Sequence, residues 1–132
     1  MENMLTYSQK KYLFAIYKVS RRGGAVRSAE VAKIVGVSKP STVKMTQRLI
    51  EEGYITKEPY TEIALTEKGI TAANELYTPS VILCDFLRSA AGVSSESADA
   101  DAVAIVSNIS NESLEKLVSY ALNMRKSETV SG

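Results

Sequence analysis

The stretch from Ser28 to Thr66 constrains the fold of this chain more than any other. Helical periodicity begins at Ser28, which can cap the helix, and ends at Gly36, a residue suited to the positive φ that closes many helices. After the turn Gly36-Val37-Ser38, a second helix is predicted to run to about Glu52. Ser38 can cap it, and Pro40 fits its first turn, where a missing N–H costs nothing. Two helices joined by so short a turn predict a helix-turn-helix.

Two short extended segments, residues 54–57 and 63–66, follow the second helix. The residues between them are polar and include Pro59, a composition typical of a turn. We therefore expect a β-hairpin, which in this position is the wing of a winged helix. Another helix, over about residues 6–21, precedes the motif and ends at Gly23-Gly24.

The rest of the chain is predicted to be helical. Apolar spacing indicates helices over about residues 66–77, 80–91, 94–107 and 110–126, with Thr78-Pro79 interrupting or kinking the first pair. The predicted fold is mainly α: a winged helix-turn-helix of three helices and a hairpin at residues 1–77, followed by a helical domain at residues 78–132.

Charge is divided unevenly between the two halves. Residues 1–69 hold 12 Lys and Arg against 7 Asp and Glu, a net charge of +5, and residues 70–132 hold 4 against 8, a net charge of −4. This difference indicates that only the first half meets an anionic partner.

The second helix of the motif presents a face suited to duplex DNA. The residues expected in its core stripe are Val43, Thr46, Leu49 and Ile50. No acidic residue occurs from Val31 to Ile50, so no carboxylate on the opposite face would repel phosphate. Lysine, arginine and glutamine donate to phosphates and base edges, and a methionine can lie against a thymine methyl. We predict DNA contacts from Ser38, Lys39, Pro40, Ser41, Thr42, Lys44, Met45, Gln47 and Arg48.

Two further groups are predicted to hold the DNA backbone. The wing offers a cation and two hydroxyls, from Lys57, Tyr60 and Thr61. Arg27 and Ser28 lie at the start of the first helix of the motif, where exposed backbone N–H groups also favour phosphate.

Several classes of function find little support. The chain has no His and shows neither a nucleophile motif nor a phosphate-binding glycine loop, so an enzyme is not predicted. It has one Cys and no apolar run long enough to cross a membrane, which favours the cytoplasm. Two alternatives stay open: a winged-helix dimer controlled by a small ligand, and a winged helix used for contacts with protein.

The chain resembles the iron- and manganese-responsive repressors of the DtxR/MntR family, closer to the shorter manganese type. The residues that carry the resemblance are 12–17, 31–38, 43–49, 52–55 and 65–69, with 86–88 and 92–93 in the second half. The resemblance implies a homodimeric repressor that binds double-stranded DNA, with the helices after Tyr77 forming the dimer contact.

The chain departs from the family pattern at the metal switch. Relatives sense metal with carboxylates and imidazoles, and the resemblance places Lys11, Phe14, Ser80, Val103, Val106 and Ser107 at those positions. A hard cation needs several oxygen or nitrogen donors, which this set does not offer, and Lys11 would repel it. We therefore expect no metal cofactor and an effector of unknown identity. A site of another kind, from Asp85, Asp99 and Asp101, stays open.

Overall fold

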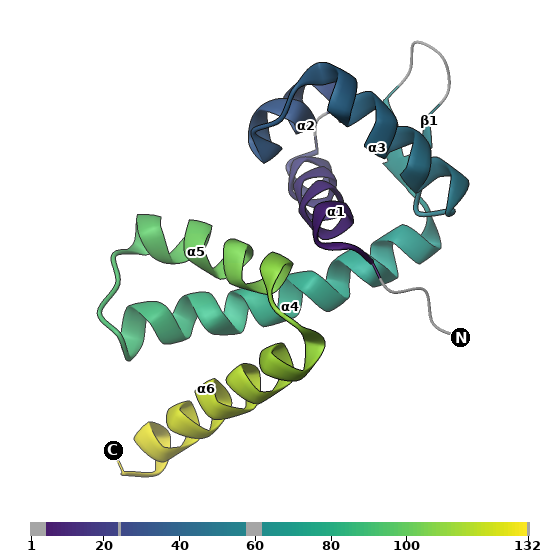
Figure 1. Cartoon of the computed structure of the whole chain (residues 1–132). Coiled ribbons are helices and arrows are strands. Elements are labelled where there is room, and N and C mark those ends of the chain that lie inside the picture. Colours follow the sequence, from purple (N-terminus) through teal and green to yellow (C-terminus); the bar gives the residue numbers. More distant parts are fainter. Residues whose placement is uncertain (1–4, 24, 58–61, 132) are drawn as a thin grey trace. The chain divides into compact units, whose positions relative to one another are not determined.

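The computed structural model describes residues 5–23, 25–57 and 62–131, and for residues 127–131 it describes the backbone alone. Along the chain it contains α1 (Tyr7–Arg21), α2 (Ser28–Val35), α3 (Lys39–Glu51), β1 (Ile55–Lys57), β2 (Ile63–Leu65), α4 (Glu67–Ser89), α5 (Ser95–Asn108) and α6 (Asn111–Ser131) (Figure 1). The predicted mainly α fold, with a hairpin directly after the helix-turn-helix, is confirmed. No helix in the described part of the chain is both long and apolar enough to cross a membrane.

The chain divides into two compact units, residues 1–75 and 76–132, which we call the first and second units. The division falls inside α4, close to the boundary after Tyr77 that the sequence predicts. Each unit is described by itself.

The first unit is built around α1. A capping box begins this helix: Thr6 Oγ1 accepts the Gln9 N–H at 3.1 Å, and Gln9 Oε1 accepts the Thr6 N–H at 2.9 Å. Helices α2 and α3 and strand β2 all contact α1 (Figure 1). The large apolar residues with the least exposure in this unit are Leu13, Ile16, Val31, Leu49 and Ile55.

The helix-turn-helix closes as the turn residues predict. Gly36 ends α2 at φ 82°, in the left-handed region that favours glycine. Ser38 caps α3 by accepting the Ser41 N–H at 3.3 Å, and Pro40 lies in the first turn. Ser28, by contrast, does not cap α2: it is the first helical residue, and Arg27 takes the cap position without a side-chain hydrogen bond.

The wing is an antiparallel pair in which Thr56 lies opposite Ala64. The Ile63 N–H donates to the Val26 carbonyl at 2.9 Å, so the segment before α2 bonds to β2. The next helix, α4, packs closely behind the hairpin, because a Cβ on Gly69 would lie 2.0 Å from the Tyr54 carbonyl oxygen. This approach fixes the start of α4 against the base of the wing.

Helix α4 continues through Pro79, so of the predicted interruption or kink at Thr78-Pro79 the interruption is wrong. Beside the proline, the Ser80 hydroxyl donates to the Tyr77 carbonyl at 2.6 Å. The second unit comprises the remainder of α4 with α5 and α6, which begin after the serines Ser94 and Ser110. Its buried apolar side chains are Leu76, Leu83, Ala98, Ala102, Val106, Leu114 and Ala121.

Candidate nucleic-acid interface

Helix α3 has one face in the core of the first unit and one face in solvent. The buried residues of α3 are Thr42, Thr46 and Leu49, at the i, i+4, i+7 spacing of a single helical stripe. The exposed residues in its sequence up to Arg48 are Lys39, Pro40, Ser41, Val43, Lys44, Gln47 and Arg48, with Met45 half-buried. The helix therefore presents a largely polar, cationic surface in its first three turns.

Two positions of α3 differ from the prediction. Thr42, predicted to contact DNA, is fully buried, and its hydroxyl donates to the Ser38 carbonyl at 3.1 Å. A threonine whose hydroxyl is satisfied within its own helix can pack as an apolar residue, so Thr42 belongs to the core and not to the interface. Val43, predicted to be in the core, is 59% exposed and lies on the outer face.

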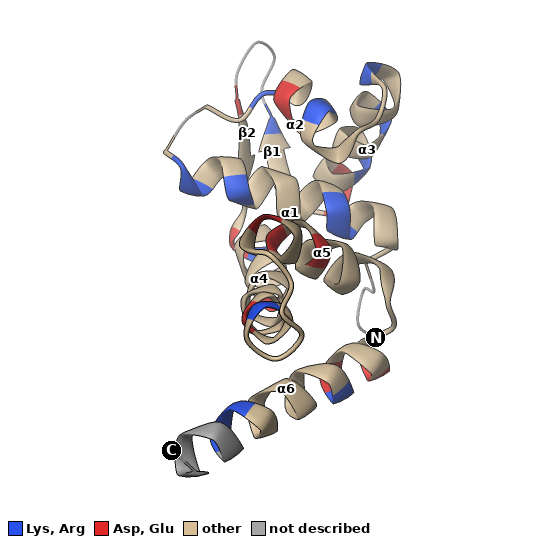
Figure 2. Ribbon diagram, turned by 90° about the vertical axis from the view of Figure 1, so that its left-hand side faces the viewer, with Lys and Arg blue, Asp and Glu red and all other residues tan. Residues whose placement is uncertain are grey.

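The two ends of this face differ in charge. Lys39 and Lys44 have no hydrogen-bond or ion-pair partner among the described residues, and no acidic residue lies between Val31 and Ile50. The C-terminal end is partly neutralised, since Arg48 Nε donates to Glu52 Oε2 at 2.9 Å and Gln47 Nε2 donates to Glu51 Oε2 at 3.3 Å. Figure 2 shows the basic residues of the three N-terminal helices in blue.

Glu52 joins α3 to α1. Its Oε1 accepts a hydrogen bond from Nε2 of the buried Gln9 at 3.0 Å, while Oε2 is held by Arg48. The hydrogen bond from Arg48, and next that from Gln9, lower the pKa of Glu52 from its ordinary value. The carboxylate therefore stays charged at neutral pH and holds the Arg48 guanidinium at the end of α3. The prediction from sequence did not include this network, although the i, i+4 spacing of Arg48 and Glu52 signals the ion pair.

The aromatic ring of Tyr54 lies beside this network. Burial raises the pKa of the Tyr54 phenol, and the charge of Glu52 adds to the rise. Lys68 Nζ lies 4.5 Å from the ring centroid and donates to the Glu52 carbonyl at 2.8 Å. These contacts tie the end of α3 to the start of α4.

The structure brings together two of the residues that are predicted to hold the DNA backbone. Lys57 Nζ on β1 donates to Ser28 Oγ at the start of α2, at 3.0 Å. Arg27, the residue before Ser28, is exposed. The wing and the N-terminus of α2 thus share one cationic surface. Tyr60 and Thr61, predicted at the tip of the wing, lie outside the described residues.

The positions that correspond to metal ligands in the family do not fit a divalent cation. In the first unit, Lys11 is exposed and cationic, and Phe14 is buried with Lys18 Nζ 5.8 Å from its ring centroid. In the second unit, Val103 and Val106 are apolar, and Ser80 donates its hydroxyl to a backbone carbonyl. Only the buried Ser107 hydroxyl has no hydrogen-bond partner there, and one hydroxyl does not bind a hard cation.

Acidic residues do not form another metal site in the part of the chain that the structure describes. There, no three His, Cys, Asp or Glu side chains lie close enough together to hold a metal ion, and this includes the aspartates Asp85, Asp99 and Asp101.

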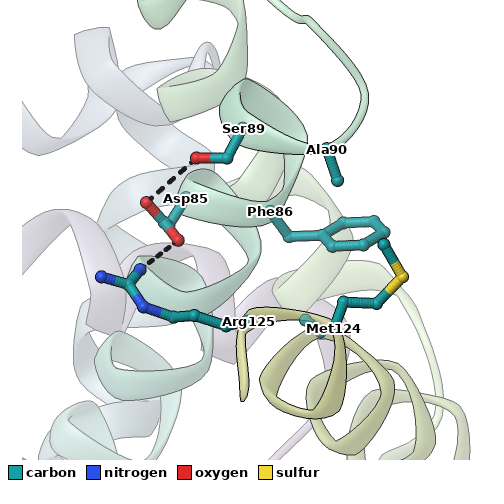
Figure 3. A pocket seen from close by; sticks show the side chains of 7 residues that line it. Asp85, Phe86, Ser89, Ala90, Met124 and Arg125 are labelled. Atoms are coloured by element: carbon teal, nitrogen blue, oxygen red, sulfur yellow. Dashed lines mark hydrogen bonds and ion pairs between the residues drawn. The ribbon is translucent and has the colours of Figure 1, made fainter. Parts of the chain in front are cut away.

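A cavity of about 230 Å³ lies within the second unit, between α4 and α6. Figure 3 shows Asp85 between Ser89 and Arg125, with Phe86 and Met124 beside them. Asp85 is ion-paired with Arg125 and accepts a hydrogen bond from the Ser89 hydroxyl at 3.5 Å. Pockets for drug-sized ligands usually measure ~300–1,000 Å³. This cavity is smaller and its charges are already paired, so it does not favour control by a small ligand.

Known DNA-binding regulators are similar to this chain in sequence. Residues 4–63 match the family model of the iron dependent repressor, N-terminal DNA binding domain. The chain is 30% identical to the HTH-type transcriptional regulator MntR of Bacillus subtilis over 114 residues, which cover 86% of this chain and 80% of MntR. It is 29% identical to an HTH-type transcriptional regulator of Methanocaldococcus jannaschii over 111 residues, or 84% of this chain and 86% of that one.

Solved structures share the fold. The manganese regulator SloR aligns with a TM-score of 0.66 and 25% identity, over 85% of this chain and 54% of SloR. IdeR of T. acidophilum aligns with a TM-score of 0.73 and 18% identity, over 91% of this chain and 55% of IdeR. The chain thus spans about half the length of each of these solved chains.

Proposed function

The chain belongs to the DtxR/MntR family of DNA-binding transcription regulators, which are not enzymes, and from this premise we propose that it represses transcription as a homodimer. Each protomer binds the major groove of duplex DNA with the N-terminal half of α3. Such a regulator acts where the chromosome is, in the cytoplasm. The description of the matching family model as a repressor supports repression over activation.

One observation carries the proposal: the first turns of α3 are open to solvent, cationic and free of carboxylates. Lys39, Ser41 and Lys44 are all exposed there. Hydroxyls, ammonium groups and the N–H groups at a helix N-terminus are the usual donors to phosphate. Arg27, Ser28 and Lys57 supply a second cationic surface, at the wing and the start of α2.

The second unit supports dimerisation. On α6, the side chains of Leu117, Tyr120 and Leu122 are exposed. Apolar residues gathered on one helix are commonly covered by a partner, and a second copy of the chain is the partner that the family implies. A helix-turn-helix dimer reads two half-sites about one turn of DNA apart, so dimerisation would place two copies of α3 on one operator.

We propose further that DNA binding does not depend on manganese or iron. The positions that would hold the ion carry a lysine, a phenylalanine, two valines and two serines. The supporting observation is that Phe14 and Val106 are buried in their own units, where apolar packing takes the place of ligand chemistry.

The decisive experiment selects bound sequences from a random duplex pool, once with a chelator and once with added manganese. We expect the same operator and the same affinity in both arms. An operator obtained only with manganese would overturn metal independence, and the absence of any enriched sequence would overturn DNA recognition.

The salt dependence of binding separates DNA from protein as the partner. Affinity should fall steeply with salt, with a slope near −0.9 per phosphate neutralised. Lys44→Ala should reduce the steepness of that slope by about 0.9 if the ammonium contacts phosphate, or weaken binding by ~1–3 kcal/mol if it reaches a base. Lys126→Ala, on α6, is the matched control and should change neither the salt slope nor the affinity for DNA. A flat salt response of the wild type would favour a protein partner instead.

A further inference from the structure

Val43 is the most exposed of the large apolar side chains in the described part of the chain, at 59%. Single exposed apolar residues are common on protein surfaces and need no explanation by themselves. The significance of Val43 comes from its position on α3.

Val43 lies at the edge of the surface that we propose enters the groove, beside the buried stripe of α3. Its helical neighbours one turn away, Lys39, Pro40 and Gln47, are exposed, as is the adjacent Lys44. None of these residues is acidic. At about 100° per residue, the buried stripe of Thr42, Thr46 and Leu49 lies about a quarter turn from Val43, and Val43 itself stays exposed.

We propose that Val43 contacts the C5 methyl group of a thymine in the major groove, which makes it a specificity-determining residue. The proposal rests on DNA binding by α3. The thymine methyl is the one apolar group that the four base pairs present in this groove. A valine has no donor or acceptor, so beside another base edge it would cover polar atoms without replacing the hydrogen bonds they make with water.

The surroundings of Val43 favour DNA over a protein partner. Lys39 and Lys44 flank it, and both are without carboxylate partners among the described residues. An apolar contact enclosed by cations matches a base edge between two phosphate backbones. A protein partner would have to supply carboxylates around an apolar socket, and its binding would not respond to a methyl group on a base.

The test removes the methyl group and leaves the base otherwise unchanged. In the operator obtained from the duplex pool, each thymine is replaced in turn by deoxyuridine, which pairs in the same way but lacks the C5 methyl. Burying one such group is worth about 0.8 kcal/mol, so the wild type should lose about fourfold in affinity at one thymine of each half-site.

Val43→Ala should abolish this discrimination, so that the affinities for thymine and uracil at that position become equal. The variant should fold normally, because an exposed position leaves no cavity and alanine is the better helix former. Ile70→Ala is the matched control: Ile70 is 44% exposed and lies in the same unit on a different helix, and its variant should keep the fourfold ratio. Thermal unfolding checks that all three proteins are folded.

The outcomes separate this inference from the proposed function. Salt-dependent binding without discrimination at any thymine would overturn the role of Val43 and leave DNA binding standing. Discrimination that persists in Val43→Ala would do the same, because another residue would then read the methyl. The absence of sequence-selective binding altogether would remove the proposed function as well.

Discussion

The first unit and the second unit fill their cores with different side chains. The first unit buries large apolar residues, with Leu13, Ile16, Leu49 and Ile55 almost without exposure. Three of the seven buried apolar residues in the second unit are alanines, and an alanine removes little apolar surface from water. Both units leave large apolar residues exposed, with Leu117 among those of the second unit. The second unit has the smaller core, so it gains more stability from burial against a partner.

The two halves also differ in charge. The net charge is +5 over residues 1–69 and −4 over residues 70–132. A basic first half is suited to an anionic polymer, and an acidic second half would be repelled by the same polymer. Taken with the cores, this difference supports the proposal that the first unit binds DNA and that the second pairs with a second copy of the chain.

The largest effect is expected from Leu49→Ala, which removes a fully buried side chain of α3. A buried Leu→Ala change costs ~2–5 kcal/mol because it loses apolar burial and leaves a cavity. Urea unfolding of the full chain should show a loss in this range. The control is Ile70→Ala on α4, an exposed site of the same unit, which should cost far less. Equal losses would contradict the role of Leu49 in the core of the first unit.

Leu117→Glu tests the second unit directly. Burying a leucine at an interface contributes ~1.5–3 kcal/mol, so a charge in its place should raise the dissociation constant of the dimer roughly 10–100-fold. Sedimentation at several concentrations measures this shift. Ser119→Glu adds the same charge at another exposed site of α6 and should have a smaller effect. If the Leu117 variant self-associates like the wild type, α6 is not the dimer contact.

Gly69→Ala probes the junction between the wing and α4. Alanine normally stabilises a helix, but here its Cβ would lie 2.0 Å from the Tyr54 carbonyl oxygen, so the backbone must move. We expect a loss of ~1–3 kcal/mol in the free energy of unfolding, typical of overpacking. Thr71→Ala, at an exposed site of the same helix, should be close to neutral. A more stable Gly69 variant would show that the junction is loose.

The smallest effect on stability is expected from Glu52→Gln. Arg48 and Gln9 lower the pKa of Glu52 below 4.5, so the charged form is favoured by folding. The stabilisation is present above pH 4.5 and is lost as the pH falls through the lowered value. For a partly exposed pair we expect ~0.2–1 kcal/mol at neutral pH, vanishing in acid, when wild type and variant are compared by urea unfolding.

Glu52→Gln also tests how the charge at the C-terminal end of α3 affects DNA binding. Without the carboxylate, Arg48 is released from its partner and the C-terminal end of the helix loses a negative charge. DNA binding should therefore become tighter, while Arg48→Ala in the wild type should weaken binding less than Lys44→Ala does. Weaker binding by Glu52→Gln would mean instead that the ion pair holds Arg48 in the orientation that DNA requires.

Much of the first unit could be predicted because its signals are local. The Ser38 cap, Pro40 in the first turn and Gly36 at positive φ are properties of a few neighbouring residues, and all three are as predicted. The helix continues through Pro79 although an interruption or a kink was predicted there, since a proline can be accommodated inside a long helix. Whether the flanking turns hold such a helix together cannot be read from composition.

The error at Thr42 and Val43 has a physical cause. By hydropathy valine is the core residue and threonine the surface residue, and a helix can place either of two adjacent positions inward. The hydrogen bond from the Thr42 hydroxyl to the Ser38 carbonyl satisfies the threonine, so Thr42 can be buried on the same stripe as Leu49 while Val43 is exposed. The sequence pattern predicted the bounds of the helix, but hydropathy did not predict which side of the helix faces the core of the first unit.

By itself, the sequence determined that this chain forms a winged helix-turn-helix and that the motif is basic. It also placed side chains unsuited to a divalent cation at the positions where the resemblance puts the family's metal ligands. These properties follow from residue identity and short spacing. The tertiary structure alone decided that Val43 faces solvent, that Glu52 holds Arg48, and that Lys57 meets Ser28. Each of these depends on how one element is turned against another, and many weak packing contacts, summed over the whole unit, fix that orientation.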